Sequence, residues 1–259
     1  MSVRLTERSW PQIKEAVAAG TVIVVPVGAT EQHGGHLPVE VDWRMAQTVA
    51  EAACQKATEA GTPALATPPI WTGYSPHHMD FPGTVTLSAA TFTSVVRDVA
   101  KSLWHHGFRK ILFLNGHGGN MHLLRAAVQQ LRFEDGVRAA AGSYWDFARD
   151  YIQQWRQSPL GGINHACEME TSLMLAVRPE LVDMTKARNA IHPAGGDLAA
   201  LGPVTQAWSF AELSQDGILG AAAMGDGSRG QALLDAIVAA VAQYIQNFYQ
   251  LDWDAPRQV

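Results

Sequence analysis

The sequence is poor in cysteine and in charged residues. Only two of its 259 residues are cysteines, Cys54 and Cys167. Two cysteines make no disulfide framework, so we expect a cytoplasmic protein. Asp, Glu, Lys and Arg together make up 17% of the chain and apolar residues 47%, whereas an average soluble protein is roughly 25% charged. This balance excludes intrinsic disorder and favours a large core, with further apolar surface buried between subunits.

Three function classes find no support in the sequence. The net charge of −5 offers no basic surface for nucleic acid or anionic lipid. No uninterrupted apolar run approaches the roughly 18 residues of a membrane span. The opening residues MSVRLTERSWPQIKEAV contain no apolar segment typical of a secretory signal. Because no repeat, low-complexity tract or Pro/Ser-rich linker divides the chain, one domain over residues 1–259 is predicted.

Strands and helices are predicted to alternate. Short apolar runs predict strands at residues 21–27, 63–66, 110–114 and 137–144. Helices are predicted at residues 6–19, 43–60, 89–106, 121–133, 147–157, 166–177 and 231–250, with residues 178–226 irregular. The alternation indicates an α/β fold whose mostly parallel sheet is covered on both faces. Ligands of such sheets bind beyond the carboxyl ends of the strands, here after Val27, Leu114 and Tyr144.

The segment after the first predicted strand gathers carboxylates and imidazoles. Within twelve residues it contains Glu31, His33, His36, Glu40 and Asp42. In extended backbone the first two point to the same side, and the last lies at or near the N-cap of a long predicted helix. Taken singly, each has an ordinary explanation as a helix cap, a solvated acid or a surface histidine. Together they indicate a cluster, because three glycines in this segment allow turns that fold side chains back on one point.

The segment after the strand at residues 110–114 reads NGHGGN and places His117 between glycines at a strand-to-helix turn. A dinucleotide-binding loop is the alternative, but its glycines run G-x-G-x-x-G and these run G-x-G-G. The acid that would bind a ribose should follow the next strand, whereas Glu134 and Asp135 precede it. His117 is therefore a candidate for the same cluster as Glu31 and His33.

A further candidate acid lies on a very apolar predicted helix. Glu170 shares a helix face with four apolar residues, Cys167, Leu173, Met174 and Val177. A carboxylate on such a face is costly unless a cation or several donors neutralise it. The alternative is a buried pair with an Arg or Lys, and the chain has only 19 of these. Glu168 faces hydroxyl side chains and is the weaker candidate.

These residue types point to metal-dependent hydrolysis. The five candidate ligands are Glu31, His33, Asp42, His117 and Glu170. Carboxylates and imidazoles without a cysteine pair suit zinc or manganese at an exposed hydrolytic site, whereas structural zinc uses mostly cysteine. Five ligands exceed one metal's usual share of protein ligands and fit two metals, roughly 3.5–4 Å apart, bridged by a carboxylate.

Longer motifs resemble the creatininase family, creatinine amidohydrolase and its relatives. In chain order they are GATEQHGGHLP with Asp42, HHMDFPGT from His77, NGHGGN, SYWDF from Ser143, HACEMETSLML from His165 and the closing MGDGSRGQALL. The resemblance covers nearly the whole chain. It implies a three-layer α/β/α fold with a mostly parallel central sheet, assembly as a homohexamer, and two divalent ions per subunit, zinc or manganese with iron as a third candidate.

The resemblance also implies a role for each candidate ligand. Glu31 and His117 would hold one metal, and His33 and Glu170 the other. Asp42 would bridge the two ions. These roles come from matching motifs and not from spacing.

Catalytic and substrate-binding roles follow from the same resemblance. His165 matches the family's catalytic histidine, which handles protons at the scissile C–N bond, and Trp145 matches an aromatic residue that lies over the substrate. Ser75 and His78 are further candidates for substrate or oxyanion contact. His77 is expected at the surface.

Two departures from creatininase itself affect the expected substrate. Bacterial creatininases carry Tyr-Glu directly after the metal-binding histidine, where this chain has Gly118 and Gly119. They also carry a Trp shortly before the catalytic histidine, where this chain has Gly161. Both glycines after His117 are expected to border the substrate and to leave room there. We therefore expect the scaffold and metals to be kept and creatinine specificity to be lost.

The sequence thus predicts a metal-dependent amidohydrolase. It would hydrolyse a C–N bond of a small, most simply cyclic, amide by a metal-bridging hydroxide, and His165 would give a proton to the leaving amine. A peptidase or formamide hydrolase on the same site is one alternative. A metal-holding protein without turnover is another. The expected partner is a small-molecule amide, with no nucleic acid and no membrane.

Overall fold

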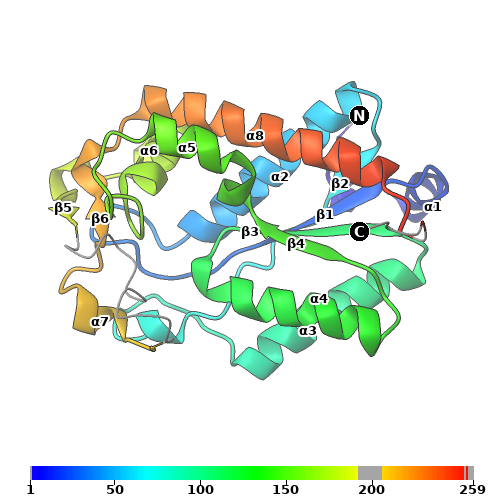
Figure 1. Ribbon diagram of the computed structural model, residues 1–259, viewed down its shortest axis with the longest axis horizontal. Helices are drawn as coiled ribbons and strands as arrows, with labels where there is room; N and C mark the ends of the chain where they lie inside the picture. Colours follow the sequence, from blue (N-terminus) through cyan, green and yellow to red (C-terminus); the bar gives the residue numbers. More distant parts are fainter. Residues whose placement is uncertain (1, 192–205, 254, 256–259) are drawn as a thin grey trace.

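A four-stranded parallel sheet forms the centre of the protein, whose computed structural model describes residues 2–191, 206–253 and 255. The strand order is β2-β1-β3-β4 (Figure 1). The strands are β1 (Val22–Val27), β2 (Ala64–Ala66), β3 (Lys110–Asn115) and β4 (Ala140–Ser143). Val22 lies opposite both Ala64 and Lys110, so β1 pairs in parallel on both sides. The predicted α/β fold with a mostly parallel sheet is confirmed.

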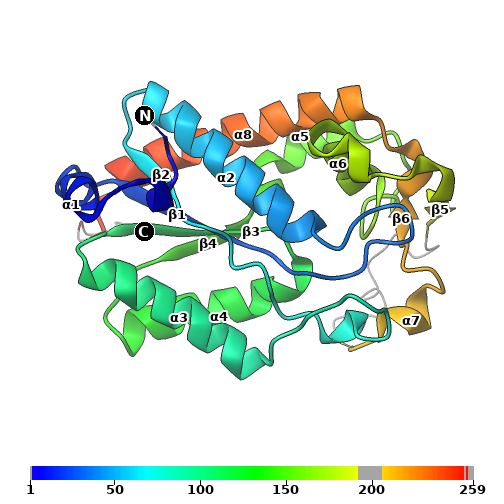
Figure 2. The same cartoon turned by 180° about the vertical axis from the view of Figure 1, so that it is seen from behind.

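Helices cover both faces of the sheet and make three layers (Figures 1 and 2). One face carries α2 (Val41–Glu59), α5 (Arg149–Trp155), α6 (Glu168–Val177) and α8 (Gly227–Gln250). The other carries α3 (Ala89–His105) and α4 (Met121–Phe133), and α1 (Trp10–Ala18) lies at the amino-terminal edge of the sheet. Among the described residues, no helix combines the length and apolarity needed to cross a membrane.

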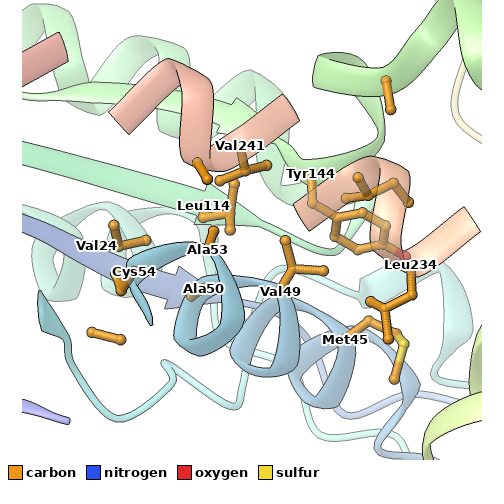
Figure 3. Close-up of a cluster of buried hydrophobic side chains, with 14 of the residues drawn as sticks. Val24, Met45, Val49, Ala50, Ala53, Cys54, Leu114, Tyr144, Leu234 and Val241 are labelled. Atoms are coloured by element: carbon orange, nitrogen blue, oxygen red, sulfur yellow. The ribbon is translucent and has the colours of Figure 1, made fainter. Parts of the chain in front are cut away.

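The two faces of the sheet are filled by alternate residues of the same strands. Val22 and Val24 of β1 pack with α2 and α8, and Figure 3 shows Val24 in this cluster. Ile23 and Val25 pack with α3 and α4. All six residues of β1 are buried. A strand covered on both faces has no polar side, which explains the unbroken apolar run in the sequence.

The elements up to α5 differ only slightly from the predicted boundaries. The first helix was predicted from residue 6 but begins at Trp10, because Gln12 Oε1 accepts the N–H of Ser9 and closes the helix start. The strand predicted at residues 137–144 pairs only over β4. The helix predicted at residues 147–157 is a 3₁₀ helix, Tyr144–Ala148, followed by α5.

Residues 178–226, predicted to be irregular, contain short elements within their described part. They include β5 (Asn189–Ala190), α7 (Phe210–Leu213) and β6 (Gly220–Ala221), and β5 and β6 pair antiparallel. These elements lie beyond the carboxyl ends of the parallel strands, at the left in Figure 1. They form one wall of the region where the sequence predicts the chemistry.

Two glycines bring the start of α2 onto the carboxyl ends of β1 and β3. A Cβ atom at Gly28 would lie 2.3 Å from Trp43 N, and one at Gly116 would lie 2.3 Å from Asp42 O. Because neither position has a side chain, the first turn of α2 packs directly on the backbone that follows the two strands. The helix begins at Val41 and not at the predicted Trp43. Asp42 is therefore inside the first turn, held over the ligand-binding edge of the sheet.

Candidate active site

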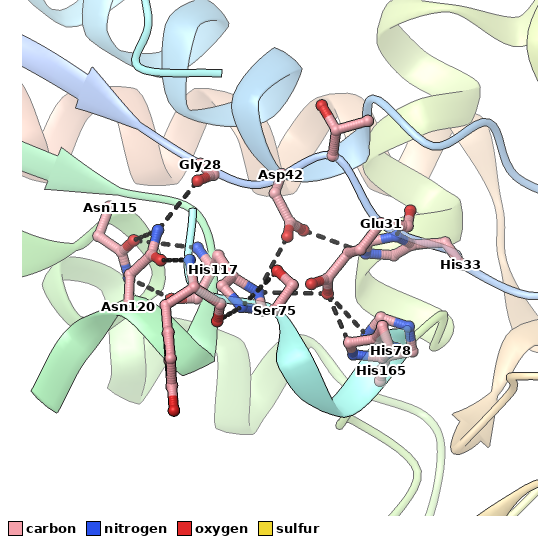
Figure 4. Close-up of polar contacts among 12 residues, drawn as sticks. Gly28, Glu31, His33, Asp42, Ser75, His78, Asn115, His117, Asn120 and His165 are labelled. Atoms are coloured by element: carbon pink, nitrogen blue, oxygen red, sulfur yellow. Dashed lines mark hydrogen bonds and ion pairs between the residues drawn. The ribbon is translucent and has the colours of Figure 1, made fainter. Parts of the chain in front are cut away.

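The candidate site lies where the strand order of the sheet reverses. β2 and β3 lie on opposite sides of β1, and crevices at such points hold the ligands of open α/β sheets. The loop after β1 carries Glu31 and His33, the turn after β3 carries His117, and α2 carries Asp42 (Figure 4). The candidate residues thus lie at the carboxyl ends of the strands, where the sequence predicts them.

Asp42 lies between two clusters of potential metal ligands. In the first cluster, His117 Nδ1 is 3.2 Å from Glu31 Oε1 and 3.1 Å from Asp42 Oδ2. In the second, His33 Nε2 is 3.1 Å from Asp42 Oδ1 and 3.8 Å from Glu170 Oε1. All five side chains are buried. Each oxygen of Asp42 thus faces a different imidazole, which is the arrangement expected of a bridging carboxylate.

Several atoms of these clusters are buried without a hydrogen-bond partner. They are both carboxylate oxygens of Glu31, Nε2 of His33 and Oδ2 of Asp42. Buried charge of this kind is strongly unfavourable unless it is compensated. The separations of 3.1–3.2 Å between ligand atoms are close to the roughly 3.3 Å expected between two ligands of a tetrahedral zinc ion with bonds of about 2.0–2.1 Å. The residues therefore fit divalent cations.

A backbone carbonyl fixes the orientation of each imidazole ring. His33 Nδ1 donates to Glu31 O at 3.2 Å. His117 Nε2 donates to Tyr74 O at 3.1 Å. Because a carbonyl oxygen only accepts, the other nitrogen of each ring keeps the lone pair that a metal needs. Nε2 of His33 and Nδ1 of His117 are the nitrogens that face the carboxylates.

Two asparagines of the NGHGGN turn hold His117 in place (Figure 4). Asn115 Nδ2 donates to His117 O at 2.6 Å and to Ser143 Oγ at 3.0 Å. Asn120 Nδ2 donates to Gly28 O at 3.0 Å. These bonds tie the turn to the carboxyl ends of β1, β3 and β4, so the ligand-bearing loops move as one unit.

Without a cation, protons on the imidazoles balance the buried carboxylates. Burial opposes the charge on His33, but Asp42 and Glu170 outweigh it and raise the pKa of His33 to about 9. Burial likewise opposes the charge on His117, and Glu31 and Asp42 together raise its pKa well above the ordinary range. Burial raises the pKa of Glu170 to about 7, with a contribution from the charge of Asp42. A bound cation has to displace these protons.

His165 lies beside the two clusters. Its Nδ1 is 3.8 Å from Glu31 Oε1, and its ring centre is 4.2 Å from that of His33. Ala166 directly after it has a φ of 50°, a left-handed conformation that non-glycine residues rarely adopt. The sequence predicts a proton carrier with a pKa near neutrality. Instead, burial and then the charges of His33 and His78 lower the pKa of His165 well below that range, so the ring is neutral at pH 7.

A cavity of about 460 Å³ opens over the clusters, within the roughly 300–1,000 Å³ typical of small-molecule sites. Its apolar lining residues are Trp145, Ile152, Ile163, Met169 and Phe210. Five residues predicted to bind substrate or move protons line it, namely His78, Gly118, Gly119, Trp145 and His165. The cavity therefore presents both apolar side chains and the polar groups of the two clusters to a ligand.

Three residues of this region lie differently from the sequence expectation. His77, expected at the surface, is half-buried, lines the cavity and stacks on His117 with ring centres 5.6 Å apart. Phe210 of α7 stacks on His78 at 4.4 Å, and no local pattern in its segment indicates this. Gln32 is buried beside the same His78 ring. Because Gln32 lies between two predicted ligands in the sequence, its position could have indicated that it belongs to the site.

Comparison with known proteins now identifies the family. The creatininase family model, described as creatinine amidohydrolase, matches residues 6–245. The chain is 33% identical over 265 residues to the creatinine amidohydrolase of Pseudomonas putida, which covers 95% of this chain and 96% of that protein. The chain belongs to the creatininase family. It is therefore an amidohydrolase that acts on C–N bonds, as the sequence motifs predict.

Other proteins similar to this chain include a peptidase and solved creatininase structures. The mycofactocin precursor peptide peptidase of Mycobacterium ulcerans is 35% identical over 208 residues, 76% of this chain and 74% of that protein. A solved structure of creatininase with Mn matches with a TM-score of 0.81 and 31% identity, over 97% of this chain and 100% of the other. The creatininase-like three-layer fold is confirmed, and a metal-binding site is consistent with both findings.

The predicted substrate contacts are not equivalent in this creatininase-family site. A Cβ at Gly118 would meet nothing within 4 Å, but one at Gly119 would lie 2.5 Å from His117 Nε2 and 2.6 Å from Tyr74 O. Only Gly118 therefore leaves room, because the turn at Gly119 is packed against the ring that precedes it. Ser75 is fully buried, and its Oγ lies 3.2 Å from His117 Nε2. It lies behind that histidine and is not among the residues lining the cavity.

The two acids of α6 have different partners. Glu168 is completely buried and accepts from Arg229 Nη1 at 2.9 Å and from Ser158 N at 3.0 Å. Glu168, and not Glu170, therefore forms the buried ion pair with an arginine that the sequence left open for Glu170. Glu170 faces His33 and accepts from Cys167 N at 3.3 Å. The preference for Glu170 as the candidate ligand agrees with this geometry.

The protons held by the site predict how metal affinity changes with pH. Below about pH 9 His33 carries a proton in the cation-free protein, and below about pH 7 Glu170 does too. Each must be displaced, so the apparent affinity for manganese should rise with pH, roughly tenfold per unit for each proton displaced. Competition with a chromophoric chelator between about pH 6.5 and 8.5 measures this. A flat affinity over the range would contradict it.

Proposed function

We propose that this protein hydrolyses a C–N amide bond of a small molecule with the help of two divalent cations. The observation that carries the proposal is the position of Asp42. Its two oxygens each lie 3.1 Å from a different buried imidazole, on His33 and His117, at the base of a cavity large enough for a small amide. Membership of the creatininase family supports the same reaction class.

Each cation would be held by three side chains, with Asp42 common to both. We assign Glu31, Asp42 and His117 to one cation and His33, Asp42 and Glu170 to the other. The candidate ions are zinc and manganese, with iron as a third. When bound, such ions supply a nucleophile from water at neutral pH and polarise an amide carbonyl.

His165 is proposed to move the proton. The ring is neutral, and its Nδ1 lies at the edge of the cavity, 3.8 Å from Glu31 Oε1. It takes the proton of the attacking water as the bond from oxygen to the carbonyl carbon forms. It then gives that proton to the nitrogen as the C–N bond breaks and the amine leaves. Trp145 and Phe210 line the cavity with apolar rings, which limits the access of bulk water to the reacting groups.

The open side of the cavity favours a substrate larger than creatinine. Gly118 contributes no side chain and leaves open space beside it. Arg149 and Asp146 line the mouth and pair with each other at 2.7 Å, so polar groups are available beyond the apolar wall. A bulkier cyclic amide is the first candidate. A short peptide is the second, and the identity to a peptide peptidase favours it.

Two substitutions separate metal binding from proton transfer. Asp42→Ala should lose both cations, because the missing carboxylate serves each of them. His165→Ala should keep the metal content and lose turnover by about 10²–10⁴-fold, as expected for loss of general acid–base catalysis. Elemental analysis of protein purified without chelator and amide-hydrolysis assays measure the two effects. A metal-free His165→Ala protein would show that this histidine is a ligand.

Substrate preference can be tested at Gly118. Metal-reconstituted protein should give a low kcat/KM for creatinine and a higher one for bulkier cyclic amides or short peptides. A site that lacks the hydrogen-bonding groups that recognise one substrate can lose up to about 10⁴–10⁵-fold in discrimination. Gly118→Tyr should narrow the cavity and reduce turnover of the bulkier amides most. Creatinine turnover within about tenfold of a dedicated creatininase, assayed in parallel, would refute the preference.

We also propose a cytoplasmic homohexamer built from a single catalytic domain. Apolar side chains are exposed on the paired segments beside the site, with Trp71 at 51%, Met79 at 53% and Val85 at 44% of full exposure. Surface of this kind is typical of subunit interfaces. Light scattering should therefore give about six times the chain mass. A stable monomer at micromolar concentration would rule the assembly out.

A further inference from the structure

We propose that Gln32 is a positioning residue that sets the proton positions on His78 and thereby orients Glu31 for its cation. The inference rests on the proposed metal site and goes beyond its ligands. Gln32 lies between the predicted ligands Glu31 and His33 in sequence, but its own side chain reaches neither ligand cluster. It is 6% exposed and carries no charge.

The amide of Gln32 has only one orientation that satisfies its neighbours. Gly34 N donates to Gln32 Oε1 at 2.8 Å. A backbone N–H cannot accept, so the oxygen must face Gly34 and the NH₂ group must face the opposite way. A Cβ at Gly217 would lie 1.8 Å from Gln32 Oε1, so the amide is also packed tightly on that side. Rotation of the amide by half a turn would place two donors face to face.

The fixed amide determines which nitrogen of His78 carries the proton. Gln32 Nε2 lies 2.9 Å from His78 Nδ1. Because the amide nitrogen only donates, Nδ1 of His78 must accept, and the proton of the neutral ring lies on Nε2. That Nε2 is 3.2 Å from Glu31 Oε1. The proton therefore lies on the ring nitrogen nearest the carboxylate. Gly34, Gln32 and His78 form a series of contacts that ends at Glu31 Oε1, where the last contact is a short polar approach and not a hydrogen bond.

This proton position excludes one alternative set of ligands. Glu31, His77 and His78 also have ligand atoms within 4.8 Å of one another. A ring nitrogen that carries a proton has no lone pair for a metal, so His78 Nε2 cannot join that set. His78 is thereby left to support Glu31 and does not bind the cation, which is compatible with Asp42 and His117 as the proposed partners of Glu31.

The backbone of Gln32 fixes a second ring. His165 Nε2 lies 2.8 Å from Gln32 O, and a carbonyl only accepts, so this nitrogen carries the proton. The 3.1 Å approach of Gln32 Nε2 to the same atom is then a contact between two donors without a hydrogen bond. Nδ1 of His165 keeps its lone pair towards Glu31, as the proposed proton transfer requires.

Neutron diffraction from deuterated crystals of the zinc-loaded wild-type protein tests the proton positions directly. Deuterium should occupy Nε2 and not Nδ1 in both His78 and His165. Deuterium on His78 Nδ1 would overturn the proposal. The measurement needs no variant and no turnover, so it remains decisive if the substrate proposal fails.

Zinc affinity tests whether Gln32 acts through His78. Gln32→Met keeps the length of the side chain and removes the donor. It should weaken one of the two zinc sites by about 10–100-fold, the usual effect of losing a group behind a ligand. His78→Phe should weaken the same site, and the double variant should be no worse than the stronger single variant. Losses that multiply would show that Gln32 acts independently of His78.

A matched control uses a glutamine far from the site. Gln130 lies on α4, is half-buried, and its Oε1 makes no hydrogen bond. Gln130→Met should leave both zinc affinities unchanged. Chelator competition gives the two affinities, and thermal unfolding of each variant separates a local effect from loss of the fold. A wild-type protein that binds zinc but hydrolyses no amide would refute the proposed function and leave the role of Gln32 supported.

Discussion

Compensation of buried negative charge is the constraint on which this protein depends. Glu31, Asp42 and Glu170 are buried at the base of the cavity, and the groups that face them are imidazoles. Each buried carboxylate is costly on its own, and like charges at short range add to that cost. Protons on two histidines can balance part of the charge, and divalent cations can balance it more completely. The electrostatic cost of such a cluster of carboxylates therefore falls when divalent cations bind to it.

The rest of the fold holds these charged groups at short range. A parallel sheet directs the loops after β1 and β3 to the same edge, and glycines at both strand ends let the first turn of α2 pack on them. Backbone carbonyls then orient His33 and His117, and the asparagines of the NGHGGN turn tie the loops together. Burial of the apolar strands and of the helices that cover them offsets the free-energy cost of this polar cluster.

Much of the fold and of the ligand set could be predicted because each rests on a local pattern. Unbroken apolar runs belong to strands buried on both faces, so β1 and β3 were located within one residue. Glu170 was preferred over Glu168 from its helix face alone. That argument was incomplete, because both acids are buried and the difference lies in Arg229, a residue 61 positions away along the chain. Two helix starts differ from the prediction where a side chain closes the first turn: Gln12 at α1, and Asp226 at α8, which begins at Gly227 and not at the predicted Gln231.

By itself the sequence determined the class of fold, the edge of the sheet that carries the chemistry and the five side chains suited to bind cations. Periodicity and residue chemistry are properties of neighbouring residues, so they can be read along the chain. Only the tertiary structure decided that Asp42 faces both imidazoles, that Ser75 lies behind His117, and that Phe210 covers the site. It alone assigned the proton on His78. These features depend on distances of about 3 Å between groups brought from separate segments, and hydrogen-bond roles follow from such contacts and not from residue type.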